Sequence, residues 1–281
     1  MLQAADLTFA YGETPVVRSV SLEVPANGFV GIIGPNGSGK TTLLRLLAGT
    51  RKPQQGGVRL DGVPLATLAR GEIARRMAVV PQETHLAFEY SVLEVVLMGR
   101  YPHLGAFQVE GPRDVALART ALAATGTLPF EARMFSTLSG GEKQRVIIAA
   151  ALAQISTDDV GRDFSRAVTS SSILLLDEPT AALDLKYQLE TVSLLRSLHA
   201  AHALAVVVST HDLNFAAALC RTLVMLKDGR VLAAGSVDEV LTSARIRDLY
   251  DVDAEVTRHP RTGHLTVVPI AGACGPHEAT E

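Results

Sequence analysis

The chain has 281 residues, of which 47% are hydrophobic, and its formal net charge is −3. This composition can form a packed core and excludes a wholly disordered chain, and the slightly acidic charge without long basic runs argues against a nucleic-acid partner. The two cysteines, Cys220 and Cys274, lie far apart and have the spacing of neither a metal site nor a disulfide framework.

The N-terminal part predicts strands rather than a targeting segment. Residues 1–6 lack the basic start of a secretory signal, and residues 2–30 predict short strands separated by turns at residues 11–12 and 25–28. The longest apolar runs in the chain, such as residues 146–153, are shorter than the ~18–20 residues that cross a bilayer. We therefore expect a soluble chain, which would need a partner for any role in a membrane.

The segment from Gly34 to Thr41 fits the phosphate-loop pattern G-x-x-x-x-G-K-[ST] at each fixed position. Residues 29–33 before it predict a buried strand, and residues 40–48 predict a helix that ends at Gly49. The loop thus precedes a helix N-terminus, where N–H groups and the helix dipole favour anions. Lys40 can hold the outer phosphates, and Thr41 can offer a hydroxyl to magnesium. The residues predicted to bind a nucleoside triphosphate here are Gly34, Pro35, Asn36, Gly37, Ser38, Gly39, Lys40, Thr41 and Thr42.

The rest of the chain predicts alternating strands and helices, which is typical of an α/β sheet with helices on its faces. The expected strands are residues 58–62, 77–80, 173–176 and 205–208, and the expected helices are residues 65–76, 91–98, 139–154 and 185–199. Ser91 and Ser139 each begin a capping-box pattern at a helix start. The polar residues 156–172 predict a surface excursion, and residues 271–281 predict a mobile tail.

Two carboxylates end the apolar strand at residues 173–176. Asp177 can hold magnesium, directly or through water, and Glu178 can orient or deprotonate an attacking water. Each of these segments also has a plainer interpretation. The phosphate loop could be a glycine-rich turn without a ligand, and the acidic pair could be an ordinary turn after a strand. Ser139 could be a simple N-cap. Because a phosphate loop and an acidic strand end occur together, nucleotide and magnesium binding is the favoured interpretation of these two segments.

The motifs and their order resemble those of the ATP-binding-cassette (ABC) ATPases over roughly residues 1–245. The matching segments are Gly34–Thr41 for Walker A, Gln82 for the Q-loop, residues 138–142 for the signature, residues 173–177 for Walker B, Glu178 for the catalytic glutamate, residues 182–184 for the D-loop, His211 for the switch histidine and Tyr11 for the aromatic that stacks on adenine. The resemblance implies an α/β P-loop NTPase fold of the ABC type. Its parts would be a mixed sheet core, an antiparallel β subdomain and a helical signature subdomain.

The resemblance also implies roles for single residues. Lys40, Gln82, Glu178 and His211 would be catalytic, His211 by hydrogen-bonding the terminal phosphate. Magnesium would be held by Thr41, Gln82 and Asp177, and ATP would also contact Tyr11 and the signature residues Ser139, Gly140 and Gly141. Asp184 can serve as an N-cap, as a D-loop residue, or as both. Two departures from the family pattern are Glu142, where glutamine is usual, and Ala181-Ala182, where a serine is usual.

The resemblance further implies partners and boundaries. The signature of one copy would face the phosphate loop of a second copy, and the pair would serve two membrane permease subunits and, indirectly, a substrate-binding protein at the cytoplasmic face of the inner membrane. The expected domains are an ATPase domain at residues 1–245 with a helical subdomain at about 85–155, a C-terminal extension with a hairpin at 246–270, and the tail.

Residues 90–103 and 256–269 resemble segments of importers of iron–siderophore complexes, haem and cobalamin. We expect residues 82–103 to transmit the ATP state to a membrane subunit, with Tyr101 and His103 on the docking surface and Arg100 sensitive to charge reversal. The alternatives are an ABC ATPase for another cargo, as importer or exporter, and a non-transport ABC ATPase. The latter is disfavoured because residues 42–138 lack sustained heptads. A P-loop kinase or GTPase would need no signature.

Overall fold

The computed structural model describes residues 1–156, 172–181, 183–202 and 204–272. The excursion predicted at 156–172 and the tail predicted from 271 therefore fall mostly outside the described residues. Ala271 and Gly272 belong to a strand, so the tail cannot begin as early as predicted. Among the described residues, no helix combines the length and the apolar character needed to span a bilayer.

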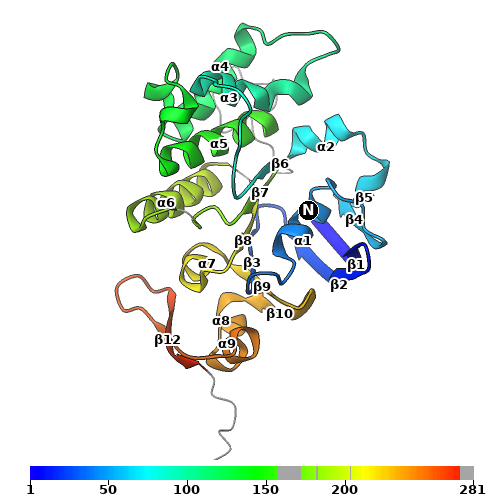
Figure 1. Ribbon diagram of the computed structural model, residues 1–281, viewed down its shortest axis with the longest axis vertical. Helices are drawn as coiled ribbons and strands as arrows, with labels where there is room; N and C mark the ends of the chain where they lie inside the picture. The colour runs from blue at the N-terminus through cyan, green and yellow to red at the C-terminus, as the bar shows by residue number, and fades with distance from the viewer. Residues whose placement is uncertain (157–171, 182, 203, 273–281) are drawn as a thin grey trace, which may run out of the picture.

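A six-stranded sheet with the order β10-β9-β3-β8-β7-β6 forms the centre of the molecule (Figure 1). Its strands are β3 (Phe29–Ile33), β6 (Met77–Val80), β7 (Ile173–Asp177), β8 (Ala205–Thr210), β9 (Thr222–Lys227) and β10 (Arg230–Ser236). Neighbouring strands are parallel except for β10, which runs antiparallel to β9. The predicted α/β class and the predicted strands at residues 29–33, 77–80, 173–176 and 205–208 are confirmed.

The central strands are buried on both faces, which explains their continuous apolar runs. In β7, Leu174 and Leu176 face a core built with the helices, and Ile173 and Leu175 face a core built with α1 (Lys40–Leu47). The alternation follows from the two-residue period of a strand. One stretch of sequence thus joins both hydrophobic cores.

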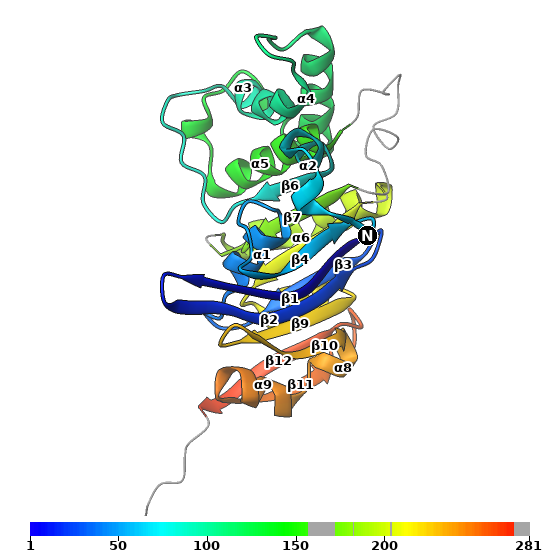
Figure 2. The same cartoon turned by 90° about the vertical axis from the view of Figure 1, so that its right-hand side faces the viewer.

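A four-stranded antiparallel sheet with the order β2-β1-β4-β5 covers α1 and the face of the central sheet on that side (Figure 2). Its strands are β1 (Leu2–Tyr11), β2 (Thr14–Val24), β4 (Gln55–Leu60) and β5 (Val63–Pro64). The predicted turns before residue 30 are confirmed, because Gly12 and Asn27 have the positive φ angles of 59° and 54° that tight turns require. This sheet is the antiparallel subdomain that the ABC resemblance implied.

Helices cover the opposite face of the central sheet. The helical part at one end of the molecule contains α3 (Val92–Leu97), α4 (Pro112–Ala124), α5 (Gly140–Ile155) and 3-10 turns at Met98–His103, Leu128–Phe130 and Phe135–Thr137 (Figure 1). Next to it lie α6 (Leu185–Ala201) and α7 (Leu213–Leu219). Both predicted capping boxes are present, at Ser91 before α3 and at Ser139 before α5.

One predicted helix is wrong in part. Residues 65–76 form a 3-10 turn (Leu65–Thr67) and a separate helix α2 (Arg70–Arg76), because Leu68 and Ala69 have extended backbone angles. The break keeps Leu65 and Leu68 on the core beneath the antiparallel sheet, while α2 packs against α5. Tertiary packing therefore overrides the local helical pattern.

Arg100, for which we expected sensitivity to charge reversal, has a completely buried side chain. Its guanidinium donates to the backbone oxygens of Ala153 at 2.7 Å and Ser156 at 2.8 Å, and to Asp114 Oδ1 at 3.0 Å. Arg100 thus satisfies carbonyls at the C-terminus of α5 and does not form part of a docking surface. Tyr101 beside it remains 58% exposed.

The C-terminal part consists of α8 (Val237–Val240), α9 (Ser243–Tyr250) and a hairpin of β11 (Val252–Arg258) and β12 (Leu265–Gly272). The hairpin confirms the one predicted within residues 256–269. It lies beside α7, where the Asn214 side chain accepts a hydrogen bond from Val267 N at 2.8 Å and donates to Val267 O at 3.2 Å. The division into an ATPase domain and a C-terminal extension stays a prediction.

Candidate nucleotide site

The predicted site residues follow four neighbouring strands of the central sheet. Because β3, β8, β7 and β6 are parallel, the segments after them meet at one edge of the sheet. The register pairs Ile33 with Thr210 and Asp177 with Ser209, so the strand ends are level. This topology brings together residues that are more than a hundred positions apart in the chain.

The phosphate loop has a shape that only glycine allows at two positions. Gly39, the N-cap of α1, has φ 103°, and a Cβ there would lie 2.7 Å from the Val16 carbonyl oxygen. A Cβ at Gly34 would lie 2.2 Å from the Leu226 carbonyl oxygen. The loop is therefore pressed against β2 and β9, and its backbone is free to face a ligand. The buried Ser38 hydroxyl has no hydrogen-bond partner among the described residues, which suits a loop built for oxygen-rich ligands.

Lys40 is buried at the mouth of this loop. Its Nζ donates to the carbonyl oxygens of Gly34 at 2.9 Å and Pro35 at 3.1 Å, and lies 3.4 Å from Glu178 Oε1. These partners fix the ammonium group between the loop and the acidic strand end. The position suits the predicted role of a cation for outer phosphates.

The predicted magnesium ligands lie close together. Thr41 Oγ1 donates to Asp177 Oδ1 at 3.1 Å, and the Ser209 hydroxyl donates to the same carboxylate oxygen. Gln82 lines the same cleft as Thr41. The hydroxyl, carboxylate and amide oxygens of these side chains are the hard ligands that magnesium prefers, so this donor set fits the ion.

Glu178 and His211 form the other wall. Glu178 has a left-handed φ of 47°, a strained conformation for this residue type, and its N–H donates to Ser209 O at 3.0 Å. Glu178 Oε2 lies 3.0 Å from His211 Nδ1, and the two side chains are 10% and 50% exposed. The buried carboxylate can accept a proton from water, and the exposed ring can reach a phosphate.

These residues surround a cleft of about 450 Å³. The lining contains Asn36, Gly37, Gly39, Lys40, Thr41, Thr42, Gln82, Glu178 and His211, all predicted, together with Val16 and Ala181. The sequence reasoning missed Val16 because β2 carries no motif at that position. It also missed Ser209, whose contact with Asp177 depends on the pairing of β7 with β8.

Tyr11, the last residue of β1, does not line this cleft. The hydrogen bond with the Thr42 side chain is the main reason why the pKa of Tyr11 lies below its usual value. The ring is partly exposed, with the Arg51 guanidinium 5.8 Å from its centroid and the Phe9 ring edge-on at 4.9 Å. Tyr11 is thus connected to the phosphate-loop helix through Thr42.

The signature residues lie outside the cleft of their own chain. Ser139 caps α5, and the hydrogen bond from its backbone N–H to Glu142 is the main reason why the pKa of Glu142 is lowered. Gly141 packs under Tyr187, where a Cβ would lie 2.4 Å from the ring, whereas Ser139 and Gly140 are exposed. None of the three signature residues lines the 450 Å³ cleft.

The D-loop can be described in part, because Ala182 lies outside the described residues. Asp184 Oδ1 accepts a hydrogen bond from Tyr187 N at 3.2 Å, which confirms its predicted N-cap role for α6. The alternative D-loop role concerns a second subunit and stays a prediction.

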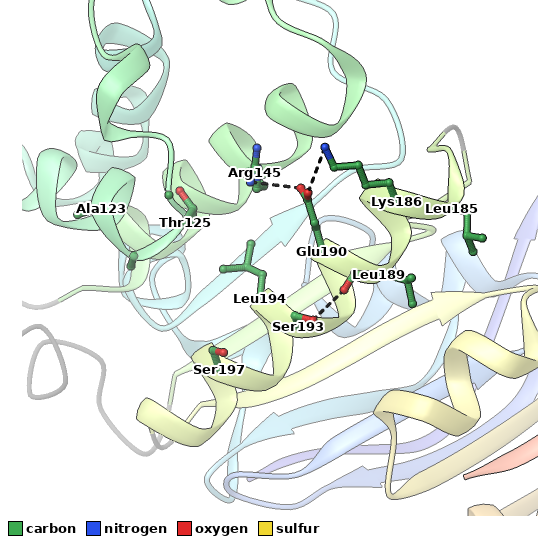
Figure 3. A pocket seen from close by; sticks show the side chains of 12 residues that line it. Ala123, Thr125, Arg145, Leu185, Lys186, Leu189, Glu190, Ser193, Leu194 and Ser197 are labelled. Carbon is green, nitrogen blue, oxygen red and sulfur yellow. Dashed lines mark hydrogen bonds and ion pairs between the residues drawn. The ribbon is translucent and has the colours of Figure 1, made fainter. Parts of the chain in front are cut away.

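A larger hollow of about 870 Å³ lies beside α6, away from the phosphate loop (Figure 3). Exposed Leu185 and Leu189 point from α6, and Glu190 lies 3.4 Å from Arg145 and 4.0 Å from Lys186. None of the residues predicted to bind nucleotide lines it. The smaller cleft contains the phosphate loop and its lysine, whereas the two cations beside the larger hollow, Arg145 and Lys186, are paired with Glu190.

Comparisons with known proteins agree with this geometry. Residues 17–157 match the family model described as ABC transporter. The hemin import ATP-binding protein HmuV of Gloeobacter violaceus is 42% identical over 273 residues, which cover 97% of this chain and 95% of that protein. The cobalamin import ATP-binding protein BtuD of Halobacterium salinarum is 39% identical over 96% of this chain, which spans 63% of that protein's length.

A solved structure of an inward-facing, metal-chelate type ABC transporter is also similar, with a TM-score of 0.80, 28% identity and 96% of each chain covered. The family model, the relatives and the fold agree, and the parallel-strand edge carries the residues of a phosphate site. The chain therefore belongs to the ABC transporter family, as an ATP-binding subunit that hydrolyses ATP.

Proposed function

We propose that this chain powers the import of a metal chelate, with haem first among the candidates and cobalamin or a ferric siderophore next, through a separate membrane permease. The observation that carries this proposal is the 42% identity with a hemin import protein over 97% of the chain. The match includes the segment at residues 90–103 and the C-terminal hairpin. The structural likeness to a metal-chelate type transporter supports the same class of cargo.

The cleft supports a hydrolytic role for each predicted residue. Lys40 would bind the outer phosphates, and Thr41, Asp177 and Gln82 would hold magnesium, which supplies positive charge to the phosphates when bound. Glu178 would accept the proton of the attacking water, and its contact with His211 would keep the ring turned toward the terminal phosphate.

We further propose that two copies act together. Ser139 and Gly140 are exposed, and the signature does not line the cleft of its own chain. A second copy can therefore present its signature to the nucleotide held at Lys40, and ATP would stabilise the closed pair because it contacts both surfaces. Tyr11 would carry the adenine ring beside this interface.

The permease would dock beside the segment that follows Gln82, with the chain peripheral at the cytoplasmic face of the inner membrane. Exposed apolar side chains gather in this part of the sequence, at Phe88, Tyr101 and Phe107. A contiguous exposed apolar patch is typical of an interaction surface, and these side chains would supply its apolar groups. His103 contributes less than expected, since its ring contacts the Gln154 backbone oxygen at 2.7 Å.

The test is uptake by the chain assembled with its membrane permease and binding protein in vesicles that contain ATP. Hemin, cobalamin and a ferric siderophore would be supplied separately. We expect one of them to be imported by the wild-type complex and none by a Glu178→Gln complex, which should still bind ATP. Import of sugars or amino acids, with all three chelates ignored, would contradict the proposed cargo and leave the ATPase assignment intact.

A further inference from the structure

Tyr250, the last residue of α9, reaches the nucleotide site from the C-terminal part of the chain. Its hydroxyl donates to the backbone oxygen of His211 at 3.4 Å, and its partly buried ring packs against the main core. No motif points to this residue, because α9 follows the last predicted site residue by more than 30 positions. The contact arises only when α9 folds back beside the carboxyl edge of the sheet.

The electrostatic surroundings of this hydroxyl favour its protonated form. Burial raises the pKa of Tyr250, and the charges of Glu178 and Asp212 raise it further, while a hydrogen bond from the Gly34 backbone lowers it. The net shift is upward, so the hydroxyl stays protonated and can donate to His211 O. The hydroxyl is therefore a hydrogen-bond donor to the residue that would face the terminal phosphate.

The surrounding contacts hold Tyr250 in place. Lys227, at the end of β9, donates to the Asp248 carbonyl oxygen and lies 3.4 Å from Asp251 Oδ1, which fixes the last turn of α9. The hairpin after α9 is tied to α7 by the two hydrogen bonds between Asn214 and Val267. Since α7 begins two residues after His211, both sides of the His211 segment are attached to the C-terminal part.

We propose that Tyr250 is a positioning residue for ATP hydrolysis: its hydroxyl holds the backbone of His211, and with it the ring that would face the terminal phosphate, in place. This inference rests on the proposed role of His211. The hydroxyl does not line the nucleotide cleft, so it acts through the His211 backbone. Small displacements of catalytic groups are costly to rate even when binding is preserved.

Tyr250→Phe removes only the hydroxyl and keeps the packed ring. We expect its kcat for ATP to fall about three- to tenfold, the effect of one lost hydrogen bond, with KM for ATP within about twofold of wild type. The thermal unfolding midpoint should fall by no more than about 2–4 °C, the shift expected for one hydrogen bond in a chain of this size. Hydrogen exchange should become faster in peptides that contain His211, which a purely structural role of the ring would not produce.

The matched control is Thr257→Val, which also removes a hydroxyl from the C-terminal part, at an exposed position of β11. A wild-type kcat in Tyr250→Phe, or an equal loss in Thr257→Val, would overturn the inference. Lys40→Ala and His211→Ala are assayed in parallel. If both hydrolyse ATP normally, the proposed site itself is wrong; if both are inactive while Tyr250→Phe is normal, only the positioning role is wrong.

Discussion

The nucleotide cleft and the signature region differ in how complete they are within one chain. In the cleft, side chains from separate strands contact one another directly, as Lys40, Glu178 and His211 do over distances of 3.0 to 3.4 Å. The signature is equally well formed locally, with a complete capping box at Ser139, yet Ser139, Gly140 and Gly141 do not line the cleft.

The comparison shows that a segment can be well ordered, as the signature is, without forming a complete site in its own chain. The cleft is assembled by sheet topology, so its geometry is decided inside the fold. The signature is shaped by a helix cap within α5 and by the packing of Tyr187 of α6 on Gly141, and in the proposed pair it would meet the nucleotide of a second copy. Variants in the cleft should therefore alter chemistry in a single chain, and variants in the signature should alter what the chain does as a pair.

The largest effect is expected for Glu178→Gln. The amide keeps the shape of the side chain but cannot accept a proton, so turnover should fall about a hundred- to ten-thousandfold while ATP binding persists. Steady-state hydrolysis and equilibrium binding measure the two effects, and light scattering should detect an ATP-dependent pair. Glu239→Gln, in the capping box of α8, is the matched control. Equal turnover in both variants would show that Glu178 is not the general base.

Arg100→Ala should be the most destabilising change in the helical part. It removes a completely buried cation and leaves the carbonyls of Ala153 and Ser156 and the carboxylate of Asp114 without this donor. Loss of one partner from a buried charged network costs about 3–5 kcal/mol of unfolding free energy. Urea unfolding measures the cost, with exposed Lys52→Ala as control. A loss of stability no greater than in the control would contradict the buried role.

Two neighbouring glycines of the signature should respond differently to alanine. A Cβ at Gly141 would lie 2.4 Å from the Tyr187 ring, whereas a Cβ at Gly140 would lie 3.6 Å from Leu183. Gly141→Ala should therefore cost about 1–3 kcal/mol of unfolding free energy through overpacking, and Gly140→Ala should cost almost nothing. In a Tyr187→Ala background, Gly141→Ala should cost almost nothing, because the clashing ring is gone. Equal stability of the two glycine variants would refute the close packing of the signature on α6.

The smallest expected change in stability compares two helix caps of the same design. Ser139→Ala and Ser91→Ala each remove a capping hydroxyl, and each should cost about 1 kcal/mol of unfolding free energy. Only Ser139→Ala should also lower turnover, because only this serine would face the nucleotide of a second copy. Denaturant unfolding and ATPase assays on both variants check this. Equal turnover in the two variants would show that Ser139 is only an N-cap, the alternative that the sequence left open.

Most of the site could be predicted because its motifs are short and local. The phosphate loop needs its glycines and lysine in one segment, and the acidic pair directly follows an apolar strand, so spacing alone identifies Lys40, Thr41, Asp177 and Glu178. The central strands were predictable for a similar reason, since strands buried on both faces are continuous apolar runs. The family resemblance then gave roles to Gln82 and His211, because an isolated glutamine or histidine carries little information about function.

The remaining features depend on contacts between distant segments. The sequence alone determined the α/β class, the phosphate loop, the acidic strand end and the capped helices, because each follows from residues within about one turn or strand. Only the tertiary structure buried Arg100 against the end of α5, broke the helix at Leu68 and Ala69, and brought Tyr250 to His211. The physical reason is that burial and hydrogen-bond partners are properties of packed neighbours, and in these cases the neighbours come from other elements of the fold.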